Sequence, residues 1–203
     1  MGVIAGIAMR RRDLPLLKLG AVILLAAACG RASTPASAAA FVDENLITMA
    51  PPGYQVGFQD KNAQRQIVEW VPAGETVDNW SEMVTVQIFH GLKVTPDAFM
   101  RDLEKRWVAS CPGAVPAHTI ANVVENGYSS LVWLLDCPKN PATGKPEITW
   151  FKAVQGNDSF YVVQKAFKFA PSKEQVTQWV GYLKAAHVCD SRLPDRPCPK
   201  PNN

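Results

Sequence analysis

Four cysteines stand in the second half of the chain, and their spacing limits the chemistry they can do. No two of Cys111, Cys137, Cys189 and Cys198 are close enough to form the CxxC half-site that structural zinc sites use. Three of them are followed directly by proline, which suits the ends of secondary structure elements rather than redox motifs. In a chain that is exported, as the N-terminus indicates, an even number predicts two disulfides with three possible pairings. Proximity along the chain favours Cys189–Cys198 and Cys111–Cys137.

Other residue types that carry chemistry stand alone. His90, His118 and His187 are scattered singly, without the helical spacing that a zinc hydrolase favours. The chain has no GxSxG elbow for a nucleophilic serine. The step Gly144-Lys145 resembles the end of a phosphate loop, but Pro146 replaces the residue that would hold magnesium. A pair of carboxylates for glycoside chemistry stays open, because such pairing is spatial. The sequence therefore predicts no catalytic residue, metal or cofactor.

Residues 1–28 have the pattern of an export signal. Arg10, Arg11 and Arg12 supply a positive start, and Leu19 to Ala28 supply a short apolar stretch. As a helix this stretch spans about 15 Å, roughly half of a bilayer core, which disfavours a permanent transmembrane span. Met9 precedes the arginines directly and is an alternative start to Met1.

The end of this signal can be interpreted in two ways. The run Leu24-Leu25-Ala26-Ala27-Ala28-Cys29 resembles the lipobox of bacterial lipoproteins, although that motif usually has leucine three residues before the cysteine. This resemblance implies that Cys29 is acylated and anchors the chain in a membrane of the cell envelope, facing the periplasm. Alternatively, an ordinary signal peptidase cuts after Ala38 or Ala40, and the product is soluble in the periplasm or secreted.

Composition separates the rest of the chain into a tether, a domain and a tail. Residues 29–44 include a stretch rich in Ala, Ser, Thr and Pro, which is typical of a flexible tether. Residues 45–189 hold the patterned sequence of one domain, and residues 190–203 form a proline-rich tail. The chain has 21 basic and 18 acidic residues, of which residues 1–28 contain four basic residues and one acidic residue. The remainder has 17 of each and is formally neutral. This neutrality gives no reason to expect a nucleic-acid partner.

Alternating strand and helix patterns predict an α+β fold. Strands are expected at 54–58, 66–71, 82–90, 118–124, 128–135, 147–154 and 160–167. Thr95-Pro96-Asp97 is typical of a helix start, and Phe99, Leu103 and Trp107 mark its buried stripe, which Met100 and Val108 widen. A second helix begins at Ser172, with Val176, Trp179, Val180 and Leu183 facing the core. Consecutive hairpins predict a mainly antiparallel sheet of six or seven strands, covered by these two amphipathic helices on one or both faces.

Short segments of the predicted domain resemble the PsbP-like fold, an α/β/α sandwich of extrinsic photosystem II subunits and bacterial envelope lipoproteins. The likeness rests on Pro52-Gly53-Tyr54 at the first strand, Val71 to Glu75 after the second, and Trp80-Ser81-Glu82 entering the third. It covers about residues 45 to 188. The resemblance implies a binding or accessory module rather than an enzyme.

The remaining feature of interest is a group of aromatic residues on the predicted hairpin strands. Trp150 and Phe151 are neighbours and must face opposite sides of a strand. Either both faces are core, or one face exposes an aromatic surface for a ligand or partner. We expect a non-catalytic envelope protein that binds another envelope protein through a sheet face or the polar loop Pro138–Pro146. The alternative is a small-molecule-binding protein or a periplasmic hydrolase with a pocket between sheet and helix.

Overall fold

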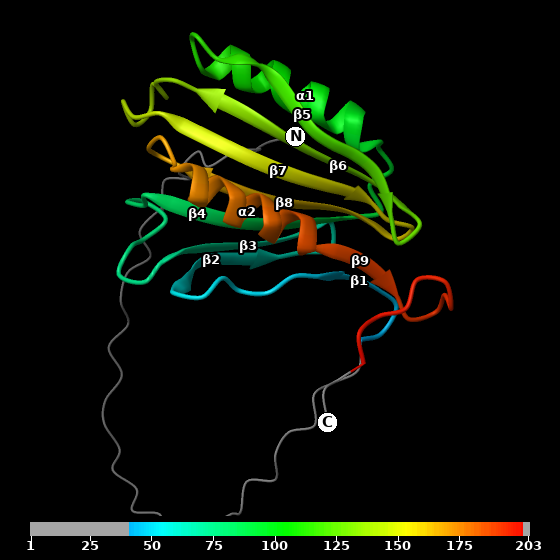
Figure 1. The fold of residues 1–203 in the computed structure, drawn as a ribbon. Helices are drawn as coiled ribbons and strands as arrows, with labels where there is room; N and C mark the ends of the chain where they lie inside the picture. Colours follow the sequence, from blue (N-terminus) through cyan, green and yellow to red (C-terminus); the bar gives the residue numbers. More distant parts are fainter. Residues whose placement is uncertain (1–40, 201–203) are drawn as a thin grey trace, which may run out of the picture. The chain divides into compact units, whose positions relative to one another are not determined.

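A seven-stranded antiparallel sheet forms the centre of the protein, in the strand order β2-β3-β4-β8-β7-β6-β5 (Figure 1). The computed structural model describes residues 41–200. The predicted signal peptide, Cys29 and most of the tether lie outside the described residues. The elements are β1 Glu44–Ile47, β2 Tyr54–Lys61, β3 Arg65–Pro72, β4 Glu82–His90, α1 Pro96–Ser110, β5 Val115–Glu125, β6 Tyr128–Cys137, β7 Glu147–Gln155, β8 Ser159–Phe167, α2 Lys173–Ala185 and β9 His187–Asp190.

Local sequence signals account for the hairpins and the helix starts. Asn126 and Gly127 both have positive φ angles, as the two-residue turn between β5 and β6 requires. The Thr95 side chain accepts a hydrogen bond from the Ala98 amide at the start of α1. Ser172 and Gln175 form a complete capping box at the start of α2. The predicted α+β architecture with two helices on an antiparallel sheet is confirmed.

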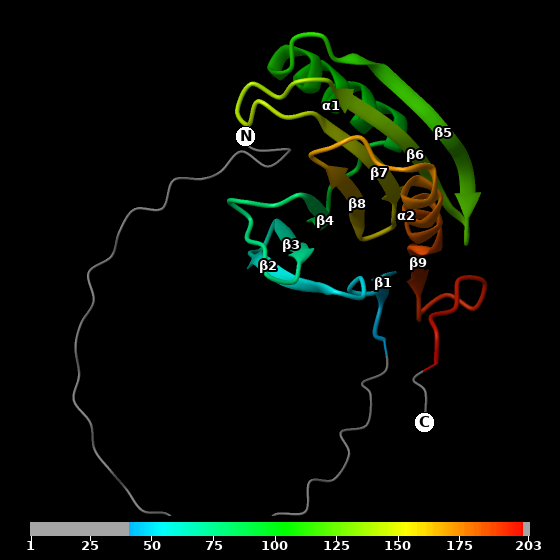
Figure 2. The ribbon, with the colours of Figure 1, turned by 60° about the vertical axis from the view of Figure 1, so that its left-hand side comes forward.

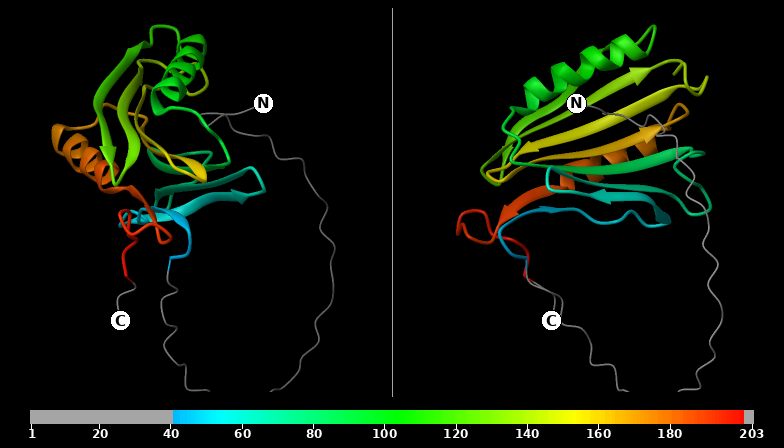
Figure 3. Two further views of the ribbon diagram at one scale, coloured as in Figure 1. Left: turned by 90° about the vertical axis from the view of Figure 1, so that its right-hand side faces the viewer. Right: turned by 180° about the vertical axis from the view of Figure 1, so that it is seen from behind.

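The two helices pack on opposite faces of the sheet. Phe151 of β7 meets Trp107 of α1, while its neighbour Trp150 belongs to a cluster with Trp179 and Leu183 of α2. Because adjacent strand residues point to opposite faces, α1 and α2 must lie on different sides. An edge-on view shows this sandwich directly (Figure 3, left).

Two short strands were not predicted from the sequence. β1 and β9 form a separate two-stranded antiparallel sheet, in which Glu44 stands opposite Asp190 and Ile47 opposite His187 (Figure 2). Four residues are too few for an alternating pattern to stand out, and their pairing joins the two ends of the described chain. One helix position also differs, because Val108 of α1 is exposed rather than part of the buried stripe.

Candidate functional site

The structure joins the four cysteines into two disulfides, Cys111–Cys137 and Cys189–Cys198. Their Cα atoms are 5.8 Å and 4.9 Å apart, respectively. These are the pairs that proximity along the chain favours. The first links the C-terminal end of α1 to the last residue of β6, and the second ties β9 to the C-terminal tail.

The aromatic residues of the hairpin strands are all buried, so the exposed aromatic surface is a wrong alternative. Helix α1 covers the rings on one side of the sheet. On the other side α2 covers Trp150 and Phe167, while Tyr161 packs in a cluster with Val188 of β9 and Leu46 of β1. The group has exposed fractions of 6% or less and comprises Trp133, Trp150, Phe151, Phe160, Tyr161 and Phe167. Both faces of the sheet are core in this region.

The histidines do not come together. His90 lies within hydrogen-bonding distance of the Ser159 hydroxyl, whereas His187 lies within hydrogen-bonding distance of the Ala185 carbonyl. His118 is exposed on β5. Among residues 41–200 no group of three His, Cys, Asp or Glu side chains is placed to hold a metal ion. The same range contains no helix long and apolar enough to cross a membrane.

The loop Pro138–Pro146 is organised around one side chain. The Asn140 amide donates to Glu147 at 2.5 Å, and its carbonyl oxygen accepts from the Ala142 amide at 2.9 Å. The Asn140 backbone amide also donates to the Lys145 carbonyl at 2.7 Å. Burial raises the pKa of the Glu147 carboxyl, while the hydrogen bond from Asn140 opposes that shift. Asn140 therefore links residues of the loop to one another and to the first residue of β7.

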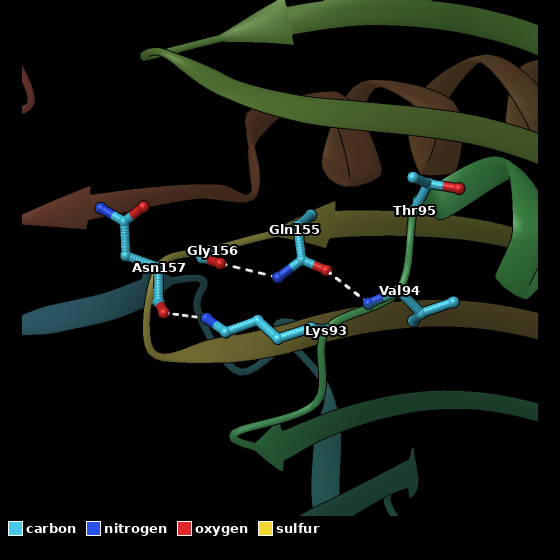
Figure 4. A pocket seen from close by; sticks show the side chains of 6 residues that line it. All are labelled: Lys93, Val94, Thr95, Gln155, Gly156 and Asn157. Carbon is cyan, nitrogen blue, oxygen red and sulfur yellow. Dashed lines mark hydrogen bonds between the residues drawn. The ribbon is translucent and has the colours of Figure 1, made fainter.

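Two shallow hollows open on the described surface. One, of about 370 Å³, is lined by Lys93 to Thr95 and Gln155 to Asn157, at the start of α1 (Figure 4). Its polar groups bind each other: the Gln155 side chain accepts from the Val94 amide at 2.9 Å and donates to the Gly156 carbonyl at 2.7 Å. Lys93 donates to the Asn157 carbonyl. The second hollow lies beside Val108 and Pro116. Neither presents convergent unpaired groups of the kind that define a small-molecule site.

The most unusual side chain of the domain is Lys165, which is fully buried in β8. Its ammonium group donates to the Glu82 carboxylate of β4 and to the Tyr54 hydroxyl of β2, both at 2.6 Å. The Tyr54 hydroxyl in turn donates to Glu82 at 2.8 Å. The ammonium also lies over the ring of Trp179 in α2, 3.7 Å from its centre. One cation thus connects three strands and a helix.

Burial controls the protonation of this cluster. Desolvation lowers the pKa of Lys165 to about 8, against the opposing hydrogen bond and charge of Glu82. Burial, and next the hydrogen bond to Glu82, raise the pKa of the Tyr54 hydroxyl. The second buried lysine, Lys152, donates to Glu125 and to the Lys184 carbonyl at the end of α2. Burial lowers its pKa as well.

Sequence reasoning missed both lysines, although a signal for them exists. Lys152 follows Trp150 by two positions and Lys165 precedes Phe167 by two, so each shares a strand face with a core aromatic residue. This parity predicts burial. Because each ammonium donates two hydrogen bonds within the domain and neither side chain reaches solvent, we assign both lysines a structural role.

The free edge of the sheet at β2 has a different character. Within residues 41–200, β2 pairs only with β3, and all but one of its residues are exposed. Val56 and Phe58 keep exposed fractions of 52% and 41%, on either side of a bulge at Gly57. β5 forms the opposite edge, where Pro116 and two register shifts interrupt the ladder. Proline and bulges protect an edge from pairing, so β2 is the less protected of the two.

Comparisons with known proteins give only distant likenesses. No family model and no curated protein matches the chain. Among solved structures, a mutant of protein Mog1 matches with a TM-score of 0.40 and 12% identity, over 70% of this chain and 85% of that one. The Ran-binding protein Mog1p of Saccharomyces cerevisiae matches with the same TM-score and coverage, at 11% identity. A likeness at this level assigns neither a fold family nor a function to this chain.

Proposed function

We propose that this chain is a non-catalytic lipoprotein of the bacterial cell envelope, which binds another envelope protein through the free edge of β2. The observation that carries the binding role is the exposure of Val56 and Phe58 on an edge strand that pairs on one side with β3. An exposed edge offers backbone donors and acceptors to an incoming strand, and apolar side chains beside it add specificity. We include in this proposal that the chain is related to PsbP-like proteins, which its sequence resembles.

The interior of the domain supports a binding role over a catalytic one. Lys152 and Lys165, the two buried lysines, each form an ion pair with a glutamate of the same domain. The two hollows are shallow, and the first is lined by groups that already bond to each other. A surface interaction is therefore better supported than a reaction in a pocket.

The proposed anchor rests on the sequence before the domain. An acylated Cys29 would leave a tether of 14 residues, 30–43, before β1, which begins at Glu44. A flexible segment of this length spans on the order of 20 Å, which would hold the domain close to the membrane surface. Labelling of growing cells with a radioactive fatty acid tests the anchor. We expect label on the wild-type protein and none on Cys29→Ser; equal label on both would remove the anchor from the proposal.

The partner is tested by a photo-crosslinking amino acid placed at Val56 in the full chain expressed in intact cells. Val124 is the matched control, since it is also an exposed valine on an edge strand, with an exposed fraction of 74%. We expect one reproducible envelope protein crosslinked from position 56 and absent from position 124. Its capture should fall at least several-fold when Phe58→Lys is added, because a lysine there blocks strand pairing. Equal products from both positions would reject the β2 edge as the binding surface.

A further inference from the structure

Strand β1 is attached to the rest of the domain by the Glu44 carboxylate, by a short ladder with β9 and by the Leu46 side chain. Glu44 accepts hydrogen bonds from three successive backbone amides in the turn after β7 and at the first residue of β8. These are the amides of Asn157, Asp158 and Ser159, at 2.5, 2.9 and 3.2 Å. The Tyr161 hydroxyl donates a fourth bond at 3.0 Å. Successive amides that point at one anion form a strong receptor for a carboxylate.

The site that receives β1 is built from segments remote in sequence. Gly156 is part of it, because a Cβ atom there would lie 2.2 Å from the Glu44 carboxylate. β9 supplies the pairing strand, and the Cys189–Cys198 disulfide ties that strand to the tail. Leu46 completes the contact by packing against both the α2 cluster and the cluster around Tyr161. We call these groups, namely residues 156–159, Tyr161, β9 and the apolar clusters under Leu46, the β1 receptor.

We propose that this receptor also accepts the β1 strand of a second copy of the chain, so that two molecules exchange their first strands. The ligand is an extended segment with a carboxylate two positions before an apolar residue, which is what Glu44 and Leu46 provide. β1 itself shows that this segment fits. The exchange does not depend on the proposed binding at the β2 edge.

The connection after β1 favours such an exchange. Thr48 to Gly53 joins β1 to β2 and contains Pro51 and Pro52, which disfavour helix and keep the preceding residues extended. An exchanged β1 would make the same ladder and the same four bonds to Glu44. The two arrangements therefore differ mainly in the path of the connection, and a higher protein concentration favours the exchanged one. Contacts of the Tyr182 hydroxyl with Thr48 and the Met49 carbonyl hold the connection in the closed form.

Crosslinking between two differently tagged full chains, co-expressed in one cell, tests the exchange. One chain carries Ile47→Cys and the other His187→Cys, two positions directly opposite each other in the β1–β9 ladder. Directly opposite residues of an antiparallel pair have Cα atoms about 4.5 to 5.5 Å apart, which is within the range that a disulfide can bridge. The matched control pairs His187→Cys with Val124→Cys on the exposed edge of β5, and a single chain with both ladder substitutions shows that the crosslink can close.

We expect a disulfide-linked pair of chains from the ladder variants, several-fold above the control pair. A synthetic peptide of residues 42–48, added to the purified mixture before oxidation, should lower the yield. The same peptide with Gln in place of Glu44 should compete at least several-fold less well. The proposal is overturned if the single-chain crosslink closes while the two-chain product stays at the control level. Failure of both crosslinks also overturns it, because β1 would then not pair with β9.

Discussion

The two faces of the sheet hold their helices in different ways. Helix α1 packs aromatic rings against Phe151 and Phe160, and the Cys111–Cys137 disulfide fixes its C-terminal end. Helix α2 packs over a face that contains the buried ammonium groups of Lys152 and Lys165. The first face depends on apolar burial and a covalent link, whereas the second also depends on ionised groups. The stability of α2 should therefore respond to pH and charge substitutions that leave α1 unaffected.

The largest expected effect is on the α1 face, from Phe151→Ala. Phe151 is fully buried and its ring stacks on Trp133 with 5.0 Å between ring centres. Removing it should lower the free energy of unfolding by about 3 to 5 kcal/mol, since the cavity cannot collapse against the stacked ring. Urea denaturation measures the loss. The exposed Phe58→Ala serves as control and should lose under about 1 kcal/mol; equal losses would mean that this face is not a packed core.

Removal of the α1 disulfide comes next, by Cys111→Ala together with Cys137→Ala. The bridge closes a loop of 26 residues, so its loss should cost about 3 kcal/mol of stability. Hydrogen exchange should increase chiefly in α1 and leave α2 protected. Cys189→Ala with Cys198→Ala is the matched comparison and should cost slightly less, because that loop spans only 9 residues. Faster exchange in α2 than in α1 would contradict the assignment of this bridge to the α1 face.

On the α2 face, Glu82→Gln should be more damaging than Lys165→Met. The first change leaves a fully buried ammonium without its carboxylate, which should cost about 3 kcal/mol. The second leaves Glu82, which keeps an exposed fraction of 19% and can turn to water, so we expect about 1 kcal/mol. Denaturant titration at pH 7 ranks the two variants. The reverse order would show that the ion pair itself, rather than the burial of the lysine, dominates this site.

The buried Lys165 also predicts that the stability of the domain depends on pH in the alkaline range. The pKa of Lys165 is about 8 in the folded protein, below the value of about 10.4 in an unfolded chain. Between these values the unfolded chain binds more protons, so the free energy of unfolding should rise with pH, by about 2 kcal/mol from pH 8 to 10. Above about pH 10 the raised pKa of Tyr54 acts in the opposite direction, because tyrosine ionises first in the unfolded chain. Lys165→Met should flatten most of the rise, and an unchanged slope would refute its origin.

How much of this arrangement could be predicted from sequence depends on how local its causes are. The hairpin at Asn126-Gly127 and the helix starts at Thr95 and Ser172 follow from neighbouring residues, and all three form as expected. Lys165 and Glu82 are 83 residues apart, so no local pattern links them.

Strand order and short strands are likewise set by distant contacts. β4 pairs with β8 in the middle of the sheet, which leaves β2 and β5 as the edges. The candidate binding edge at β2 is therefore visible only in the folded protein. The pairing of β1 with β9 depends on Glu44 reaching a turn more than 110 residues away.

The smallest expected effect compares the two helices at their starts. Ser172→Ala removes the capping hydroxyl of α2, and Thr95→Ala removes that of α1; each should cost about 1 kcal/mol. The consequences should differ in where they appear. α1 is fixed at its far end by the disulfide, so Thr95→Ala should loosen only its first turn. α2 has no such link, so Ser172→Ala should speed hydrogen exchange along the helix as far as Leu183. Exchange confined to the first turn in both variants would show that the buried lysines fix α2 as firmly as the disulfide fixes α1.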